Sequence, residues 1–528
     1  MAPDGWVYDR VRAERGKEAP PRGVRSMELG KLIETLDIEP VSGSASGVRI
    51  SDLTDDSRTV LPGSLFVARP GVREDGRKYI KQAVRDGAVA VLTDAEGERL
   101  VDTRHAVALV AKDVPQVAAQ IAERFHGNPT RKLKLVGITG TNGKTTVAHL
   151  VHGIMNHAGV RTGLIGTVEI DDGREIAQAE MTTPPAIELS RTFALMVDAG
   201  CKAAVIEASS HALDQRRVGG LAFDIGVFTT FGTDHMDYHE GRDDYLKAKQ
   251  RLFLMLPEKG IAVVNADDPA CAEMIEGCKA RIVRCSMVKG DWTVRVIKRR
   301  IDGIRVQITG PAGTIEASLP LMGDHNAMNL LEAVAVAHEL GVESEAIAAA
   351  LAHPKLPRGR LERVPGKSDV DVFIDFAHTP DALERTLTEM RRAMNESHHQ
   401  GSLWIVFGCG GNKDTTKRPV MGRIAGDLAD KVVLTSDNPR TERPEAIVEE
   451  IFEGVEPARR SDVVKLPDRA EAIVRAVADA EPGDVVIIAG KGHERFQELC
   501  DEHGHKVVRE FDDVSLASAC LRGRASVP

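Results

Sequence analysis

The most constrained stretch of the sequence runs from residue 135 to residue 146, where an apolar run ends in glycines followed by a lysine and two threonines. It reads Leu-Val-Gly-Ile-Thr-Gly-Thr-Asn-Gly-Lys-Thr-Thr, and the residues after it have the apolar spacing of a helix. Glycines allow backbone N–H groups to surround phosphate oxygens, and a helix N-terminus adds positive potential. Lys144 can neutralise phosphate charge, and the Thr145 hydroxyl can bind Mg²⁺. The stretch therefore predicts a loop that binds a nucleoside triphosphate rather than an ordinary glycine-rich turn.

The spacing of the glycines differs from that of the common P-loop. In the common form a glycine stands five residues before the glycine that precedes the lysine, and Ile138 occupies that position here. Gly137 and Gly140 stand six and three residues before Gly143 instead. The chain therefore carries a variant of the loop.

Length and composition limit the possible classes of protein. A chain of 528 residues is too long for one hydrophobic core, and we expect three domains. A net charge of −10 and an aromatic content of 4% argue against a partner that is nucleic acid or an anionic membrane. No apolar run approaches the roughly 18 residues of a membrane span. The seven scattered cysteines lack metal-ligand spacing and favour a reducing, cytoplasmic location.

The order of apolar and polar segments predicts an α/β fold in three domains. Residues 1–26 are expected to be a disordered extension, and residues 27–130 a small mixed α/β domain with helices at 29–36 and 77–86. Strands and helices alternate in residues 131–356, which predicts a parallel sheet behind the phosphate loop, with an antiparallel insert at 292–320 on its edge. The strands are expected at 133–139, 163–168, 203–208, 225–230 and 261–265. Residues 357–528 alternate in the same way and predict a second, Rossmann-like domain, with strands at 370–376, 403–408, 431–436 and 484–489.

Polar loops follow the predicted strands, and ligands of parallel sheets bind at those strand ends. Glu207 and His235 follow two strands of the central domain, so we expect them to hold Mg²⁺ beside Thr145, although a lone histidine at such a place is more often structural. Four further loops, at 375–378, 408–413, 437–440 and 490–494, predict a second ligand site in the last domain.

Several motifs in order along the chain resemble those of the Mur ligases, the ATP-dependent amino-acid ligases of peptidoglycan precursor synthesis. They are residues 140–146, 207–217, 229–239, 326–329 and 408–419, and the resemblance extends from about residue 27 to residue 517. It implies a UDP-binding N-terminal domain, a central P-loop ATPase-like domain and a C-terminal amino-acid-binding domain. It also implies a monomer with small-molecule substrates, among them ATP, and Mg²⁺ as cofactor.

The resemblance implies three groups of contact residues. ATP would be bound by Gly140, Thr141, Asn142, Gly143, Lys144, Thr145, Thr146, Asn326, Asn329, Arg360, Asp375 and His378. The UDP part of a UDP-muramoyl dipeptide would contact Ser57, and its muramoyl-peptide part Thr182, Thr183, Ser209, Gln215 and Arg217. The metal would be held by Thr145, Glu207, His235 and Lys249, and Lys144, Lys249 and His235 would be catalytic. Phe376 stands where the family usually has tyrosine, with little expected consequence.

Lys249 has a metal-binding role in this resemblance only as N6-carboxylysine. An unmodified lysine would repel Mg²⁺, whereas addition of CO₂ converts the amine into a carboxylate-like anion. Lys247 lies two residues away, and the spacing from Tyr245 favours Lys249 as the modified residue.

Within the family, the string Asp437-Asn438-Pro439-Arg440 resembles that of the members that add meso-2,6-diaminopimelate to UDP-N-acetylmuramoyl-L-alanyl-D-glutamate. Diaminopimelate differs from lysine by a second carboxylate, which a guanidinium can bind bidentately. By the same resemblance, Arg418, Gly490 and Glu494 complete the amino-acid site, with Glu494 at the distal ammonium. Lysine would be rejected because it leaves Arg440 buried without its anion.

The mechanism implied by the resemblance activates a carboxylate. The D-glutamyl carboxylate attacks the γ-phosphate of ATP, and the amine of diaminopimelate then attacks the resulting acyl phosphate. Three alternatives remain open from the sequence: the same chemistry with L-lysine, a folylpolyglutamate-synthetase-like ligase, and a P-loop NTPase that works as a switch or motor. The last would hydrolyse ATP without the muramoyl dipeptide.

Overall fold

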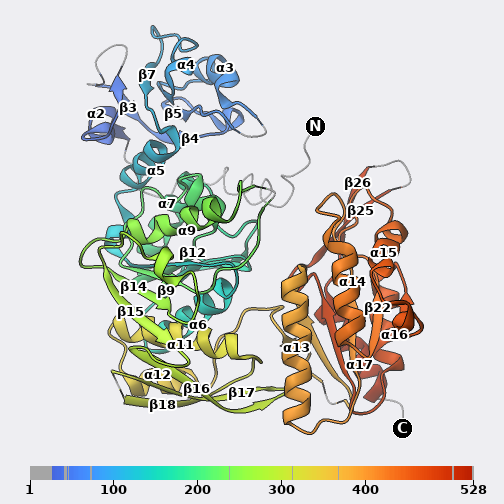
Figure 1. Cartoon of the computed structure of the whole chain (residues 1–528). Helices are drawn as coiled ribbons and strands as arrows, with labels where there is room; N and C mark the ends of the chain where they lie inside the picture. Colours follow the sequence, from blue (N-terminus) through green and yellow to red (C-terminus); the bar gives the residue numbers. More distant parts are fainter. Residues whose placement is uncertain are drawn as a thin grey trace.

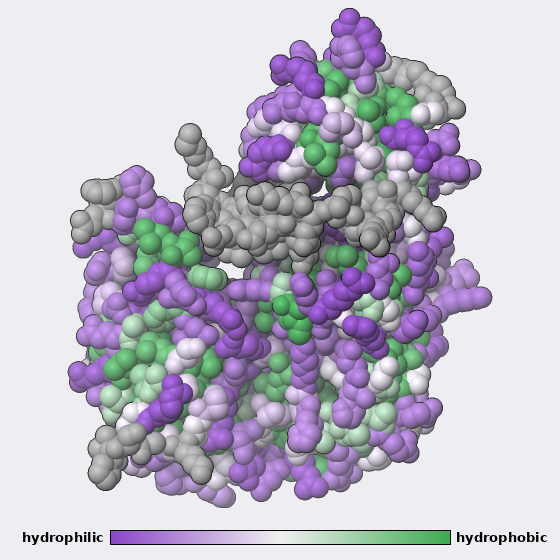
Figure 2. Space-filling view, turned by 180° about the vertical axis from the view of Figure 1, so that it is seen from behind, coloured by the Kyte–Doolittle hydropathy of each residue, from purple (hydrophilic) through white to green (hydrophobic). Residues whose placement is uncertain are grey.

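The computed structural model describes residues 26–40, 45, 47–71, 74–236, 238–311, 313–366, 368–501 and 505–525. Three lobes follow one another along the chain, coloured blue, cyan to yellow, and orange to red in Figure 1. The extension expected at residues 1–26 lies, apart from Ser26, outside the described residues. Among the helices that are described, none has the length and apolar character needed to span a membrane. Figure 2 shows hydrophilic residues spread over all three lobes, with apolar areas interrupted between them.

The N-terminal lobe is built on a five-stranded sheet in the order β2-β7-β6-β5-β4. Its strands are β2 (Glu39–Pro40), β4 (Asp52–Thr54), β5 (Ser64–Val67), β6 (Ala90–Thr93) and β7 (Val107–Val110), of which only β2 is antiparallel to its neighbour. Helix α5 (Val114–Phe125) packs its buried face against this sheet and leads into the central lobe. The predicted small mixed α/β unit is therefore present.

Two helices of this lobe are shorter than predicted. The helix expected from Leu29 to Leu36 ends as α2 (Leu29–Ile33), because Thr35 adopts a left-handed φ of 62° that cannot continue a helix. The helix expected from Arg77 to Asp86 begins as a 3₁₀ turn, η2 (Gly76–Tyr79), and becomes α3 (Ile80–Arg85). The Asp75 carboxylate caps that turn through the backbone N–H of Arg77.

The central lobe contains an eleven-stranded sheet in the order β11-β10-β9-β12-β8-β13-β14-β15-β16-β17-β18. The predicted parallel strands are present as β8 (Lys134–Thr139), β9 (Thr162–Ile165), β12 (Ala203–Glu207), β13 (Ile225–Phe228) and β14 (Ile261–Asn265). The insert forms β16 (Trp292–Arg300), β17 (Gly303–Gly310) and β18 (Gly313–Leu319), an antiparallel unit at the sheet edge as predicted. Strands β10 (Glu169–Asp171), β11 (Ile176–Gln178) and β15 (Arg281–Ser286) were not predicted.

The position of β8 decides where ligands can meet in this lobe. It lies between β12 and β13, and both neighbours run parallel to it, so the loops after all three strands leave the same edge of the sheet. Helices α6 (Lys144–His157) and α11 (Asp324–Glu339) pack together on one face. Helices α7 (Ala186–Asp198) and α9 (Arg242–Leu254) contribute to the core on the other. The phosphate loop is therefore at the centre of the sheet.

The C-terminal lobe has a six-stranded sheet in the order β19-β20-β24-β21-β22-β23. Its predicted strands are present as β20 (Asp371–Asp375), β21 (Leu403–Phe407), β22 (Lys431–Leu434) and β24 (Val485–Ala489), and all of them pair in parallel. The remaining strands are β19 (Glu362–Arg363) and β23 (Val463–Lys465). The surrounding helices are α13 (Pro380–Glu396), α14 (Lys417–Leu428), α15 (Pro444–Glu453), α16 (Arg469–Asp479) and α17 (Asp513–Ala525).

The three large sheets confirm the predicted α/β fold class with a doubly covered central sheet. They fall within the segments expected as domains, since the sheets span 39–110, 134–319 and 362–489. The boundaries at 130/131 and 356/357 stay a prediction. A separate two-stranded hairpin, β25 (Phe496–Cys500) and β26 (Lys506–Glu510), was not predicted.

A buried ion pair joins the helices of the C-terminal lobe to its sheet. Arg469 and Asp513 are both fully buried, with Nε to Oδ1 at 2.9 Å and Nη2 to Oδ2 at 2.6 Å. The same guanidinium donates to the carbonyl oxygens of Ser436 and Ala489, at 3.3 and 3.0 Å. Those carbonyls stand where the loops at 437–440 and 490–494 begin, so the pair fixes the base of both loops.

Removal of one partner of the Arg469–Asp513 pair should lower the free energy of unfolding far more than replacement of both. Asp513→Ala leaves a buried, unpaired guanidinium and should lower the free energy of unfolding by about 3–5 kcal/mol, measured by urea denaturation. Replacement of both residues by apolar ones, Arg469→Met with Asp513→Leu, should recover much of that loss. The matched control is Asp479→Ala, which breaks the exposed Arg475–Asp479 pair and should change little. Equal losses in Asp513→Ala and Asp479→Ala would contradict a structural role for the buried pair.

Candidate active site

The phosphate loop joins β8 to α6 and depends on two of its glycines. Gly140 and Gly143 have φ values of 149° and 92°, which side chains rarely adopt. A Cβ at Gly140 would lie 2.0 Å from Thr229 Oγ1, and one at Gly143 would lie 2.5 Å from Asn329 Oδ1. The loop is thus packed closely between the end of β13 and helix α11, and neither position has room for a side chain.

Lys144 begins helix α6 and folds back over the loop. Its Nζ donates to the carbonyl oxygens of Gly140 and Thr141, at 2.8 and 2.9 Å. Burial lowers the pKa of Lys144, while the negative charges of Glu207 and Asp234 act in the opposite direction. The amine is therefore held at the inner surface of the loop, close to carboxylates.

Glu207 ends β12 as a completely buried carboxylate with three donors around it. Thr145 Oγ1 donates to its Oε2 at 3.0 Å, Thr167 Oγ1 to the same oxygen at 3.0 Å, and the Thr167 N–H to Oε1 at 2.8 Å. The predicted neighbours Thr145 and Glu207 are thus brought together. A hydroxyl and a carboxylate are hard oxygen donors of the kind that Mg²⁺ binds.

Lys249 lies on α9 directly behind the loop. Its Nζ donates to the Gly140 carbonyl oxygen at 2.8 Å and stands 4.4 Å from the centre of the Tyr245 ring. Burial lowers the pKa of Lys249 well below its ordinary value, and the nearby charge of Lys144 lowers it further. Lys247 is exposed, so the two lysines occupy very different environments.

His235, the third residue of the predicted metal set, lies beside His211, Tyr245 and Asp234. Its ring packs edge-on against His211 with centroids 4.7 Å apart, lies 6.4 Å from Tyr245, and its Nε2 is 3.4 Å from Asp234 Oδ2. In the ranges of the chain that the structure describes, no three His, Cys, Asp or Glu side chains converge on a common metal position. Thr145 and Glu207 are in contact with each other. The binding of a metal by all four predicted residues stays a prediction.

The residues predicted to hold the muramoyl peptide form a hydrogen-bonded group beside Glu207. Thr183 Oγ1 donates to the Glu207 carbonyl oxygen at 2.6 Å and lies 3.2 Å from Ser209 Oγ. Arg217 donates to the Thr183 carbonyl oxygen and to Gln215 Oε1, both at 2.8 Å. Thr182 joins the group through Thr167, with 3.1 Å between their hydroxyl oxygens.

The N-terminal lobe supplies a cation to the same region. Burial lowers the pKa of Arg217, and the charge of Arg69, which follows β5, lowers it further. Arg69 was not among the predicted residues, although it stands next to a glycine-rich polar loop that the sequence displays. Ser57 lies in the 3₁₀ turn η1 (Ser57–Thr59) of this lobe and is half-buried.

The predicted ATP contacts outside the loop come from two lobes. On α11, Asn329 Nδ2 donates to Asn326 Oδ1 at 2.9 Å. In the C-terminal lobe the guanidinium of Arg360 stacks on the Phe376 ring at 4.7 Å. Burial lowers the pKa of Arg360, while the negative charges of Asp375 and Glu207 act in the opposite direction. Because Glu207 belongs to the central lobe, Arg360 lies within electrostatic reach of the phosphate loop's surroundings. The phenylalanine thus preserves a flat surface for Arg360.

Two further predicted contacts flank Arg360. Asp375 accepts hydrogen bonds from the N–H groups of Leu361 and Ala377 and from Thr386 Oγ1, at 2.8 to 3.2 Å. His378 is exposed, and its carbonyl oxygen accepts a hydrogen bond from Lys417. Asp375 is the last residue of β20, and His378 lies in the loop that follows it.

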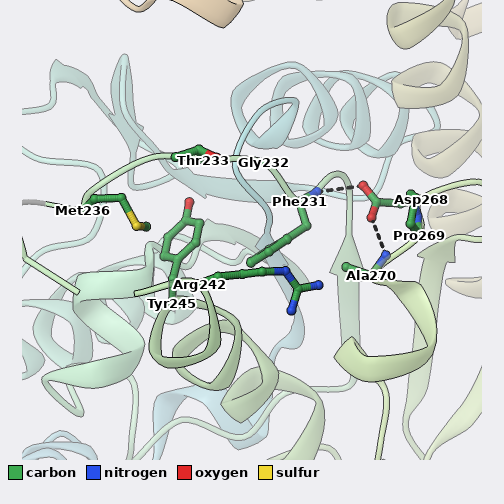
Figure 3. A pocket seen from close by; sticks show the side chains of 9 residues that line it. All are labelled: Phe231, Gly232, Thr233, Met236, Arg242, Tyr245, Asp268, Pro269 and Ala270. Atoms are coloured by element: carbon green, nitrogen blue, oxygen red, sulfur yellow. Dashed lines mark hydrogen bonds between the residues drawn. The ribbon is translucent and has the colours of Figure 1, made fainter. Parts of the chain in front are cut away.

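A cavity of about 360 Å³ opens beside the phosphate loop (Figure 3). Phe231, Met236, Tyr245, Pro269 and Ala270 form apolar parts of its wall. Tyr245 Oη lies 3.1 Å from Thr141 Oγ1, which connects the cavity to the loop. Both charged residues of the wall have partners within the protein. Arg242 pairs with Glu273, and Asp268 accepts hydrogen bonds from the N–H groups of Phe231 and Ala270. The remaining lining residues are Gly232 and Thr233.

The predicted amino-acid site lies at the ends of β21, β22 and β24. Arg418 is completely buried and is neutralised by Glu442, at 2.8 and 3.0 Å, and by Glu450 at 2.9 Å. Glu494 Oε2 accepts hydrogen bonds from Asn438 Nδ2 and Lys491 Nζ, both at 3.0 Å. A Cβ at Gly490 would lie 2.6 Å from Asp437 Oδ2. The predicted residues are brought together, and Glu442, Glu450 and Lys491 are additional members.

One expectation about Arg440 is wrong. From the sequence, Arg440 is expected to be a buried cation that lacks an anion unless diaminopimelate is bound. In the structure its side chain is 31% exposed, and its Nε pairs with Glu498 Oε2 at 2.9 Å. Glu498 belongs to the unpredicted hairpin β25–β26, so nothing near Arg440 in the sequence indicates this partner.

Three domain families match consecutive parts of the chain. The Mur ligase family catalytic domain matches residues 49–126, the Mur ligase middle domain residues 138–337, and the Mur ligase glutamate ligase domain residues 359–492. Folylpolyglutamate synthase from Mycobacterium tuberculosis shares the fold, with a TM-score of 0.57 at 22% identity over 71% of this chain and 92% of that chain.

Curated relatives align over most of the chain. The UDP-N-acetylmuramoyl-L-alanyl-D-glutamate--2,6-diaminopimelate ligase of Chlorobium phaeobacteroides is 41% identical, covering 90% of this chain and 94% of its own length. The protein of the same name from Gloeobacter violaceus is 42% identical, with coverages of 95% and 99%. A solved structure that also bears this name matches with a TM-score of 0.69 and 29% identity, over 95% of this chain and all of that one. With matches to all three domain families and relatives of this identity, the chain belongs to the Mur ligase family.

Proposed function

We propose that this chain is an ATP-dependent ligase that joins meso-2,6-diaminopimelate to UDP-N-acetylmuramoyl-L-alanyl-D-glutamate, with release of ADP and phosphate, in cytoplasmic peptidoglycan precursor synthesis. The observation that carries the proposal is an identity of about 40% over nine-tenths of the chain to relatives named for this reaction. The arrangement of the site agrees with it. A phosphate loop lies at the centre of one sheet, and an arginine-containing loop lies at the strand ends of another.

The chemistry begins with activation of the D-glutamyl carboxylate. Its oxygen attacks the γ-phosphorus of ATP, the bond to ADP breaks, and an acyl phosphate forms. The diaminopimelate amine then attacks the acyl carbon, loses a proton, and phosphate leaves. The charge on the transferred phosphoryl group is stabilised by the loop N–H groups, by Lys144 and by Arg360. A protein nucleophile is not required for either step.

Mg²⁺ fits the oxygen donors at the end of β12. Thr145 and Glu207 would hold it, because their hydroxyl and carboxylate lie together beside the loop. When bound, Mg²⁺ would neutralise charge on the phosphate oxygens.

The environment of Lys249 supports its carbamylation. CO₂ reacts with the unprotonated form of an amine, and the buried position of Lys249 beside Lys144 lowers its pKa and favours that form. The product is an anion next to the cation of Lys144. Two neighbouring lysine side chains would thereby become an ion pair.

Lys249→Ala should remove most of the ligase activity, by about 100-fold or more, because the carbamate anion that would help to hold Mg²⁺ beside the phosphates is lost. Short carboxylates such as acetate or propionate should restore part of the rate in an ADP-release assay, since they can occupy the vacated space. Lys247→Ala, on the exposed side of the same helix, is the matched control and should retain activity. Full activity of the Lys249 variant would refute the modified-lysine role.

Arg440 should act on diaminopimelate alone. Because the side chain is partly exposed and already paired, Arg440→Ala should cost about 2 kcal/mol, or roughly 30-fold in KM for diaminopimelate, with little change in KM for ATP. Arg440→Lys should recover only part, since the planar fork is missing. The exposed neighbour Arg443 provides the control Arg443→Ala. Equal changes in both KM values would make Arg440 a structural residue.

Substrate omission and competition separate the remaining alternatives. We expect ADP release only when ATP, UDP-N-acetylmuramoyl-L-alanyl-D-glutamate and diaminopimelate are all present, and a preference for diaminopimelate when L-lysine competes. ATP hydrolysis without the muramoyl dipeptide would indicate an NTPase switch or motor. Preferred turnover of L-lysine would assign the chain the same chemistry with another amino acid.

A further inference from the structure

The hairpin β25–β26 is attached to the arginine-containing loop rather than to any of the three large sheets. Gln497 Nε2 donates to Ser436 Oγ at 3.0 Å and to the Asp437 carbonyl oxygen at 2.7 Å. The Glu498 N–H donates to Asn438 Oδ1 at 3.0 Å, and the Arg440 N–H donates to the Glu498 carbonyl oxygen at 3.2 Å. Strand β25 is thus hydrogen-bonded along residues 436–440, and it sets where Glu498 stands relative to Arg440.

The Arg440 side chain is held on one side and open on the other. Nε pairs with Glu498, and Nη1 donates to the Gly411 carbonyl oxygen at 2.8 Å. A guanidinium has five N–H donors, two of them on Nη2. Among the described residues Nη2 has no hydrogen-bond partner, so the fixed side chain presents free donors.

Glu498 is itself held from its far side. Its Oε1 lies 2.9 Å from Lys506 Nζ, across the hairpin, while its Oε2 pairs with Arg440. Burial acts to raise the pKa of Glu498, but Lys506 and Arg440 outweigh it and lower the pKa. The carboxylate is therefore ionised and fixed between two cations.

We propose that Glu498 is a positioning residue that orients Arg440 for the second carboxylate of the amino-acid substrate and so contributes to selectivity against lysine. The inference rests on the proposed function. Bidentate binding of a carboxylate requires the guanidinium plane to be aligned with it, and a side chain fixed beforehand in that orientation loses less entropy on binding. Glu498 and Gly411 fix that plane without using Nη2.

The test compares steady-state kinetics of the full-length chain with Glu498→Ala, Glu498→Asp and the control Glu510→Gln, which removes a carboxylate from the same hairpin opposite Phe496. Glu498→Ala should raise KM for diaminopimelate about tenfold, the cost of one side chain ordered on binding. The kcat and the KM for ATP should change less than about twofold. Glu498→Asp should restore part of the affinity, and the control should resemble the parent chain.

Selectivity supplies the second readout. Because L-lysine has no second carboxylate, its kcat/KM should not fall in Glu498→Ala, and the preference for diaminopimelate should drop about tenfold. An unchanged or lowered KM for diaminopimelate would overturn the proposal, the lowered value meaning that Glu498 competes with the substrate for Arg440. If Glu498→Ala fails to fold, as judged by its thermal transition, Lys506→Gln tests the same chain of contacts. Absence of diaminopimelate-dependent ADP release in the parent chain would instead refute the proposed function.

Discussion

The site depends on one buried negative charge, the carboxylate of Glu207. A carboxylate at this depth is tolerated only when donors surround it, and Thr145 and Thr167 provide them. These donors belong to the first turn after the phosphate loop and to the connection after β9, and the Glu207 carbonyl oxygen binds Thr183 as well. One residue thereby sets the relative positions of the loop, the residues predicted to contact the muramoyl peptide and the strand between them.

Much of the fold could be predicted because its central strands are buried on both faces. Runs such as 134–139, 203–207 and 485–489 are nearly continuous in apolar residues, as parallel strands in α/β sheets are. Strand β15 escaped prediction because the exposed residues Arg281 and Arg284 interrupt its apolar pattern. The hairpin β25–β26 escaped for a related reason. Its second strand is exposed throughout, so burial left no pattern in its sequence.

The candidate site could be predicted where its residues are neighbours in sequence. The phosphate loop and the string 437–440 are contiguous, and their chemistry can be read from composition and order. Partners that come from other segments could not be found in this way. The carboxylates around Arg418 come from 24 and 32 residues further along the chain, and nothing local indicates that either will face it. The error about Arg440 has the same origin, since Glu498 reaches it only through the folded hairpin.

The hairpin β25–β26 shares no strand with the large sheets, and its second strand is exposed throughout. Changes in its length or sequence would therefore leave the six-stranded core intact. Selection for folding of the lobe and selection for the choice of amino acid would then act on different residues. The residues that keep the lobe folded are under one set of constraints, and those proposed to tune amino-acid choice can vary under another. Through the proposed role of Glu498, amino-acid choice is adjusted from a hairpin that lies outside the six-stranded sheet.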